Sequence, residues 1–111
     1  MYNYLTDREY RSIKNSWYDN DWSMGSIVLE HYYAKKTELR YMRKHKMISR
    51  FKFHVLMNQT AHIFSKCIDC VEKLKNTRIE SFDFAVSHLE ECIMKLDLIG
   101  YTVKRNGYDE Q

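Results

Sequence analysis

The feature that most constrains the fold is a run of residues at helical spacing through the middle of the chain. Alternating intervals of four and three residues connect Phe53, Met57, Thr60, Phe64, Cys67, Val71 and Leu74. This spacing places the whole set on one face of an α-helix. The chain has no proline and only three glycines, which leaves little turn chemistry for a multi-stranded sheet. The sequence therefore predicts a mainly helical protein with a long central helix.

Two helices are predicted before the central one. Thr6 and Glu9 have the spacing of a capping box, so we expect a helix from Asp7 to about Tyr18. After a polar loop, a second helix should run from Met24 to about Lys44. The apolar stripe of this second helix is interrupted by Lys35 and consists of Val28, Tyr32, Leu39 and Met42.

A fourth helix is predicted near the end of the chain. Thr77 and Glu80 again have capping-box spacing, and Gly100 supplies a stop signal. The stripe between them consists of Phe82, Ala85, Leu89, Ile93 and Leu96. Because a short connection separates this helix from the central one, the two should form a long antiparallel hairpin. The predicted fold is a single helical domain over residues 1–111, a small four-helix arrangement.

An alternative fold contains one short strand pair. The segment from Arg50 to Val55 alternates polar and apolar residues, and the segment from Tyr101 to Arg105 does so more weakly. Such alternation is typical of half-buried strands. The second choice of fold is therefore α+β.

The sequence favours a soluble protein in a reducing compartment. No apolar run approaches the roughly 18 residues that cross a bilayer, and residues 1–7 lack the apolar centre of a signal peptide. Three cysteines, an odd number, fit reduced thiols better than a disulfide framework. We expect a cytoplasmic location and no membrane partner.

Charge is distributed very unevenly along the chain. Eight basic residues lie between Lys35 and Lys52 and only Glu38 opposes them, which gives this segment a charge of +7, whereas the rest carries −4. Four of the basic residues fall on one sector of the second helix: Lys36, Arg40, Arg43 and Lys44. Clustered cations attract phosphate or acidic protein surfaces. The alternative is a solvated face, or one that pairs with acidic residues of the fourth helix.

Aromatic residues are also segregated. All five Phe lie between Phe51 and Phe84, whereas both Trp and seven of nine Tyr lie in the first 41 residues. Phe suits a dry core, and Tyr and Trp suit partly wet interfaces. The front half is therefore a candidate interface, unless its aromatic residues simply cap the rim of the core. The candidate anchors are Trp17, Trp22, Tyr33 and Tyr41.

One group of residues has the chemistry of a metal site. Cys67, Cys70, His88 and Cys92 follow the pattern C-x2-C and H-x3-C, and a hairpin would bring the two pairs to similar heights. However, Cys67 lies on the core stripe and Cys92 beside it, where a thiol commonly acts as a small hydrophobic group. We therefore expect no metal and no other cofactor.

Catalytic patterns are weak in this sequence. The five His are scattered, and Glu90 and Glu91 are adjacent, so they would point about 100° apart on a helix. We expect no enzymatic activity, no catalytic residue and no small-molecule substrate. The leading hypothesis is a small regulatory or inhibitory protein that docks on a protein or nucleoprotein partner. The alternatives are direct binding of DNA or RNA through the segment from Lys35 to Lys52, and a metal-stapled structural module.

Overall fold

Local capping interactions set the ends of the first helix, α1 (Asp7–Asp19). The Thr6 hydroxyl accepts a hydrogen bond from the Glu9 backbone N–H at 3.0 Å, and the Glu9 carboxylate accepts one from the Thr6 N–H at 2.9 Å. This reciprocal pair is the predicted capping box. The helix ends where Asn20 adopts the left-handed conformation, with φ 54°, which asparagine tolerates better than most residues.

The computed structural model describes residues 3–21 and 23–101, and within them the chain is helical with no strand. After α1 come α2 (Ser23–Lys44), α3 (Arg50–Lys75), the short 3-10 helix η1 (Ile79–Ser81) and α4 (Phe82–Asp97). The mainly helical prediction, with four α-helices and a C-terminal hairpin, is confirmed.

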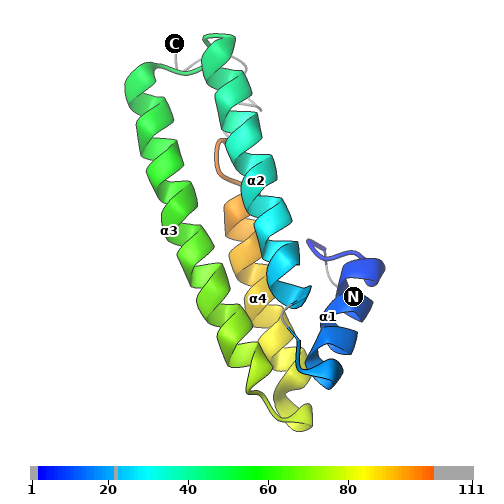
Figure 1. Cartoon of the computed structure of the whole chain (residues 1–111). Helices are drawn as coiled ribbons and strands as arrows, with labels where there is room; N and C mark the ends of the chain where they lie inside the picture. Colours follow the sequence, from blue (N-terminus) through cyan, green and yellow to red (C-terminus); the bar gives the residue numbers. More distant parts are fainter. Residues whose placement is uncertain (1–2, 22, 102–111) are drawn as a thin grey trace.

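The helices form an elongated bundle about 48 Å long and 17–23 Å across. Figure 1 shows α2, α3 and α4 running along its length, with α3 antiparallel to both neighbours. The short helix α1 packs at the end where α3 connects to α4. At the other end, α2 and α3 extend past the end of α4 to their own connecting turn. We call this far end, which carries residues 40–52, the basic tip.

Two clusters of buried side chains fill the bundle. The larger one joins all four helices near the α1 end and includes Ile13, Val28, Val71 and Leu89. The smaller one lies toward the basic tip and consists of Leu39, Met42, Ile48, Leu56, Leu96 and Ile99. The predicted stripe of α3 faces these clusters, because Thr60, Cys67, Val71 and Leu74 are buried and the remaining members are half-buried.

The alternative fold with a strand pair is not found in the described residues. The segment from Arg50 to Val55 forms the first turns of α3, and Ser49 caps this helix because its hydroxyl accepts a hydrogen bond from the Lys52 N–H at 3.0 Å. In the other proposed strand, Tyr101 is not in a strand, and residues 102–105 lie outside the described residues.

The second capping box is also absent. The Thr77 hydroxyl donates to the Lys73 carbonyl at 3.0 Å, so it extends the end of α3 instead of starting α4. Neither Arg78, which precedes η1, nor Ser81, which precedes α4, makes a side-chain capping bond.

The expectation that Phe marks the dry core holds only in part. Phe82 is buried, and Phe64 is half-buried against Tyr32, with ring centroids 4.1 Å apart. In contrast, Phe51 is 78% exposed and Phe84 is 70% exposed. Both exposed rings lie off the helical stripes that the sequence defines, so the periodicity predicted the core better than residue type did.

The buried position of Leu89 leads to a stability prediction. Leu89→Ala should lower the free energy of unfolding by about 2–5 kcal/mol, because truncation leaves a cavity in the larger cluster. Phe51→Ala removes a large but exposed side chain and should change it by less than about 0.5 kcal/mol. Urea denaturation measures both values. Equal losses for the two variants would contradict the assignment of the core.

Candidate partner-binding surface

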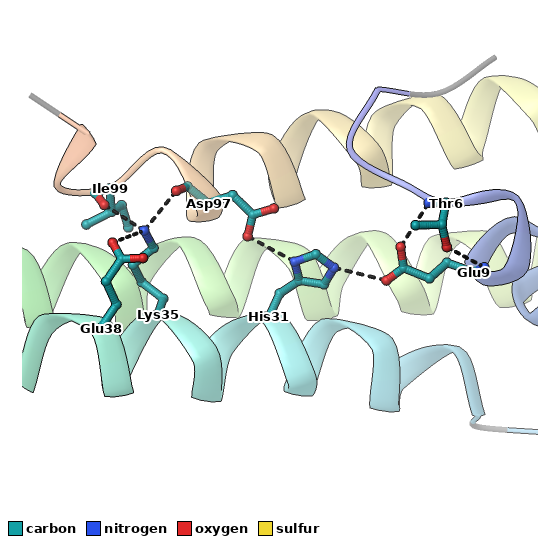
Figure 2. Close-up of polar contacts among 7 residues, drawn as sticks. All are labelled: Thr6, Glu9, His31, Lys35, Glu38, Asp97 and Ile99. Atoms are coloured by element: carbon teal, nitrogen blue, oxygen red, sulfur yellow. Dashed lines mark hydrogen bonds and ion pairs between the residues drawn. The ribbon is translucent and has the colours of Figure 1, made fainter. Parts of the chain in front are cut away.

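The inner face of α2 is fixed by a buried lysine. Only 4% of Lys35 is exposed, and its ammonium group donates to the backbone carbonyls of Asp97 at 2.8 Å and Ile99 at 2.7 Å (Figure 2). It also donates to the Glu38 carboxylate at 2.9 Å. Lys35 therefore ties α2 to the end of α4. The lysine that interrupts the apolar stripe of α2 in the sequence thus has a structural role.

One turn earlier, His31 links three helices. Its Nδ1 lies 2.9 Å from the Asp97 carboxylate on α4, and its Nε2 lies 3.1 Å from the Glu9 carboxylate on α1 (Figure 2). The hydrogen bond to Asp97 raises the pKa of His31 to about 9, although burial opposes this shift, and the Glu9 bond adds to it. Burial alone would raise the pKa of Glu9, but hydrogen bonds from Thr6 and His31 hold it below its ordinary value.

The opposite face of α2 points to solvent and carries cations and tyrosines. Tyr33, Arg40 and Lys44 lie at intervals of seven and four residues, so they form one outward line, with Tyr41 beside it. Tyr33 is 54% exposed, and Tyr41 is 58% exposed with its ring packed near His45. We call these four residues, Tyr33, Arg40, Tyr41 and Lys44, the α2 stripe.

Two of the predicted basic residues are partly used within the fold. The Lys36 ammonium lies 4.6 Å from the centroid of the Tyr32 ring and 5.4 Å from that of Tyr33. The Arg43 guanidinium donates to the Ile48 carbonyl at 3.4 Å and so supports the turn between α2 and α3. Both are half-buried, so they flank the α2 stripe and do not lie at its centre.

The basic tip continues the α2 stripe around the end of the bundle. Lys46, Arg50 and Phe51 are all exposed there. Within the described residues, Arg40, Lys44, Lys46 and Arg50 make no ion pair. The proposed pairing of the basic face with acids of α4 is therefore not found in that part of the chain. Sequence reasoning missed Phe51, although its position off the α3 stripe was the signal that could have found it.

Trp17 does not lie with the basic residues. It is half-buried at the α1 end, where its ring packs against Phe82 with centroids 5.0 Å apart and its indole N–H donates to the Thr77 carbonyl at 3.1 Å. These contacts hold α1 against the connection between α3 and α4. Trp22 lies outside the described residues.

The candidate metal ligands are brought close together, but not as a metal centre. The Sγ atoms of Cys70 and Cys92 are 3.4 Å apart, and Cys67 is buried beside them. The ring of His88 packs edge-on against Phe84, with centroids 4.6 Å apart. Across residues 3–21 and 23–101, no group of three or more His, Cys, Asp or Glu side chains is placed to hold a metal ion.

Two of the thiols, those of Cys67 and Cys70, also lack the features of an activated nucleophile. Burial and the neighbouring sulfurs of Cys92 and Cys70 together raise the pKa of Cys67 to about 12. Burial and the hydrogen bond to Cys92 together raise the pKa of Cys70 to about 11. Such groups stay protonated near neutral pH, whereas a catalytic cysteine needs a lowered pKa.

Comparisons with known proteins do not assign this chain to a family. Neither the protein-family models, nor the curated proteins, nor the solved structures gave a match. In the part of the chain that the structure describes, no helix has both the length and the apolar character required to cross a membrane.

The contacts of Lys35 predict a large effect of its removal. Lys35→Met keeps the apolar stem but removes the ammonium group that donates to the carbonyls of Asp97 and Ile99. The free energy of unfolding should fall by about 2–4 kcal/mol, as expected when buried polar groups lose their partners. Lys44→Met, at an exposed position on the same helix, should change it by less than about 0.5 kcal/mol. Similar urea midpoints for the two variants would contradict the role given to Lys35.

The contacts of His31 predict a pH-dependent stability. Because the pKa rises from 6.5 to about 9 on folding, protonated His31 stabilises the fold fully below pH 6.5, and this contribution is lost as pH rises through 9. The free-energy difference between wild type and His31→Gln should be about 1–3 kcal/mol larger at pH 6 than above pH 9. Subtracting the unfolding free energy of the variant from that of wild type removes the pH effects of all groups that both proteins share. A difference that is constant with pH would show that His31 stays neutral.

Proposed function

We propose that this protein is a small, non-enzymatic regulatory or inhibitory protein that docks on a protein or nucleoprotein partner through the α2 stripe and the basic tip. The observation that carries the proposal is that exposed aromatic rings lie on one surface with cations that make no ion pair in the part of the chain that the structure describes. Tyr33, Tyr41 and Phe51 are each more than half exposed, and Arg40 and Lys44 lie among them.

The geometry of α2 favours a docking role. From Tyr33 to Lys44 the helix rises about 16 Å, which spans the centre of a modest protein interface. Tyrosine and arginine are the residue types most enriched at energetically dominant positions in interfaces. The inner face of the same helix is fixed by Lys35 and His31, so the outward side chains are presented without a large conformational cost.

The charge of the basic tip supports an acidic partner surface. Residues 40–52 carry six basic and no acidic residues, so the basic tip attracts such a surface over distances of about a Debye length and accelerates encounter. Proteins with an acidic face, and nucleoproteins with exposed phosphates, both meet this requirement.

Direct binding of bare DNA or RNA is the second candidate function. Exposed Tyr41 and Phe51 near Arg50 could stack on unpaired bases while the cations neutralise phosphates. The protein partner is preferred because Lys36 and Arg43, two of the predicted cations, are engaged within the fold.

Variants that change charged or aromatic residues separate the effect of the α2 stripe on the association rate from its effect on the dissociation rate. Purified partner is first obtained by affinity capture from nuclease-treated lysate of the source cells. Arg40→Glu with Lys44→Glu should then slow association by about tenfold or more at low salt, because steering charges act mainly on the on-rate. Tyr33→Ala with Tyr41→Ala should mainly accelerate dissociation, with a loss of about 2 kcal/mol or more. Surface plasmon resonance measures both rates.

Matched variants control for net charge and for the loss of an aromatic ring. Lys66→Glu with Lys95→Glu makes the same change in charge at exposed positions outside the α2 stripe, and Tyr18→Ala removes an exposed ring at the α1 end. Both should bind like wild type. If the two charge-reversal variants lose association equally, the effect is one of net charge and the α2 stripe is not the site.

The nucleic-acid alternative has its own test. Isolated protein should bind random DNA or RNA no more tightly than about 10⁻⁶ M at physiological salt, which is the range of non-specific binding. Submicromolar binding that falls steeply with salt, and that Arg40→Glu with Lys44→Glu abolishes for every sequence, would favour direct nucleic-acid binding instead.

A further inference from the structure

The α3–α4 hairpin contains a pair of cysteine thiols that has no role in the proposed binding surface. Cys70 lies on α3 and Cys92 on α4, and their Sγ atoms are 3.4 Å apart. Both side chains are half-buried. The third cysteine, Cys67, is fully buried one turn before Cys70 on the same helix.

We propose that Cys70 and Cys92 are an oxidation site, at which a small-molecule disulfide such as oxidised glutathione converts the two thiols into a cross-link between α3 and α4. A disulfide bond is about 2.05 Å long, so the two sulfurs need to approach each other by only slightly more than 1 Å. The thiols come from two helices that already pack side by side.

Access to the pair is through Cys70. A surface hollow of about 280 Å³ is lined by Cys70, Lys73, Phe84, Ala85 and His88. An oxidant that enters this hollow reaches Cys70 first. Cys92 can then attack the oxidised Cys70 sulfur. Cys67 has no such access, because it is buried in the larger core cluster.

The surroundings of Cys70 slow its reaction with an oxidant near neutral pH. Burial and the bond to Cys92 raise the pKa of Cys70, the nearby Lys73 lowers it, and Asp69 raises it, with a net value of about 11. The thiolate is the species that attacks a disulfide, so exchange should be slow near neutral pH. The site therefore responds to sustained oxidising conditions and not to brief ones.

The reaction proceeds in two exchange steps. The Cys70 thiolate attacks one sulfur of oxidised glutathione, the S–S bond breaks, and the first glutathione leaves with the bonding electron pair. The Cys92 thiolate then attacks the Cys70 sulfur of the mixed disulfide and displaces the second glutathione. The two protons lost by the cysteines are taken up by the two glutathione thiolates. The protein is oxidised by two electrons, and the oxidised glutathione is reduced to two molecules of glutathione.

The cross-link should stabilise the folded state and should not alter the α2 stripe. Cys70 and Cys92 are 22 residues apart in sequence, so the bond closes a loop that includes the α3–α4 connection. Closing such a loop reduces the conformational freedom of the unfolded chain and stabilises the folded state. The α2 stripe lies on another helix, so oxidation should leave partner binding unchanged and the two proposals can fail independently.

The full chain is incubated with oxidised glutathione and examined by intact mass spectrometry and thermal unfolding. Wild type and Cys67→Ala should each lose the mass of two hydrogen atoms and unfold about 5 to 20 °C higher. Dithiothreitol should reverse both changes. Cys70→Ser and Cys92→Ser should show neither change, and their circular dichroism in the reduced state establishes that they fold.

Alkylation of unfolded, oxidised wild type provides a second measurement, with one free thiol expected per chain. Three free thiols, or stable glutathione adducts in place of the cross-link, would overturn the proposal. Loss of two hydrogen atoms by Cys70→Ser or Cys92→Ser would also overturn it, because the bond would then involve Cys67.

Discussion

The arrangement of the helices depends on one buried ammonium group, that of Lys35. The last carbonyls of a helix have no partner within the helix and must be satisfied from elsewhere. In α4 the Asp97 carbonyl, and in the turn beyond it the Ile99 carbonyl, both accept from Lys35. This contact fixes the position at which α4 ends and holds Ile99 in the smaller core cluster. The chain then turns at Gly100, where φ is +80° and a conformation that favours glycine is required.

Fixing the end of α4 also determines where the candidate binding surface lies. Since α4 stops at Asp97, α2 and α3 continue beyond it as a two-helix extension (Figure 1). The basic tip occupies this extension, so its cations are held away from the acidic residues near α1. Lys35 and His31 face inward from α2, and they leave the side of the helix that carries Tyr33 and Arg40 free for a partner. The same helix thus supplies both the anchor of the fold and the candidate interface.

Sequence reasoning succeeded where the determining interactions are local. The capping box of Thr6 and Glu9 follows from contacts within a few residues, and the structure has it. It failed where the partner is distant. Lys35 looked like an interruption of an apolar stripe because its carbonyl partners lie 62 and 64 residues further along the chain. The apparent capping box at Thr77 is an exception, because a local contact defeated it: the Thr77 hydroxyl donates to the Lys73 carbonyl, four residues earlier in α3.

In the candidate site too, the sequence predicted what one helix brings together and missed what depends on contacts between helices. The sequence identified Arg40, Lys44, Tyr33 and Tyr41 as one region because a single helix carries them. It could not separate Trp17 from that region, since only the tertiary fold places the Trp17 ring against Phe82 at the α1 end of the bundle. The close approach of two thiols likewise required the packing of α3 on α4.

The turn at the basic tip shows how the end of a helix is satisfied without a distant partner. Among the described residues, three have left-handed backbone conformations: Asn20, Lys46 and Gly100. Asparagine and glycine adopt this conformation readily, whereas lysine at φ 58° costs about 1–2 kcal/mol. Just after α2, the Met47 N–H donates to the Met42 carbonyl at 2.8 Å and the Lys46 N–H donates to the Arg43 carbonyl at 3.1 Å. These two bonds satisfy carbonyls at the end of α2 and offset the cost of the left-handed lysine. The end of α2 is therefore satisfied by its own backbone, whereas carbonyls at the end of α4 accept from Lys35.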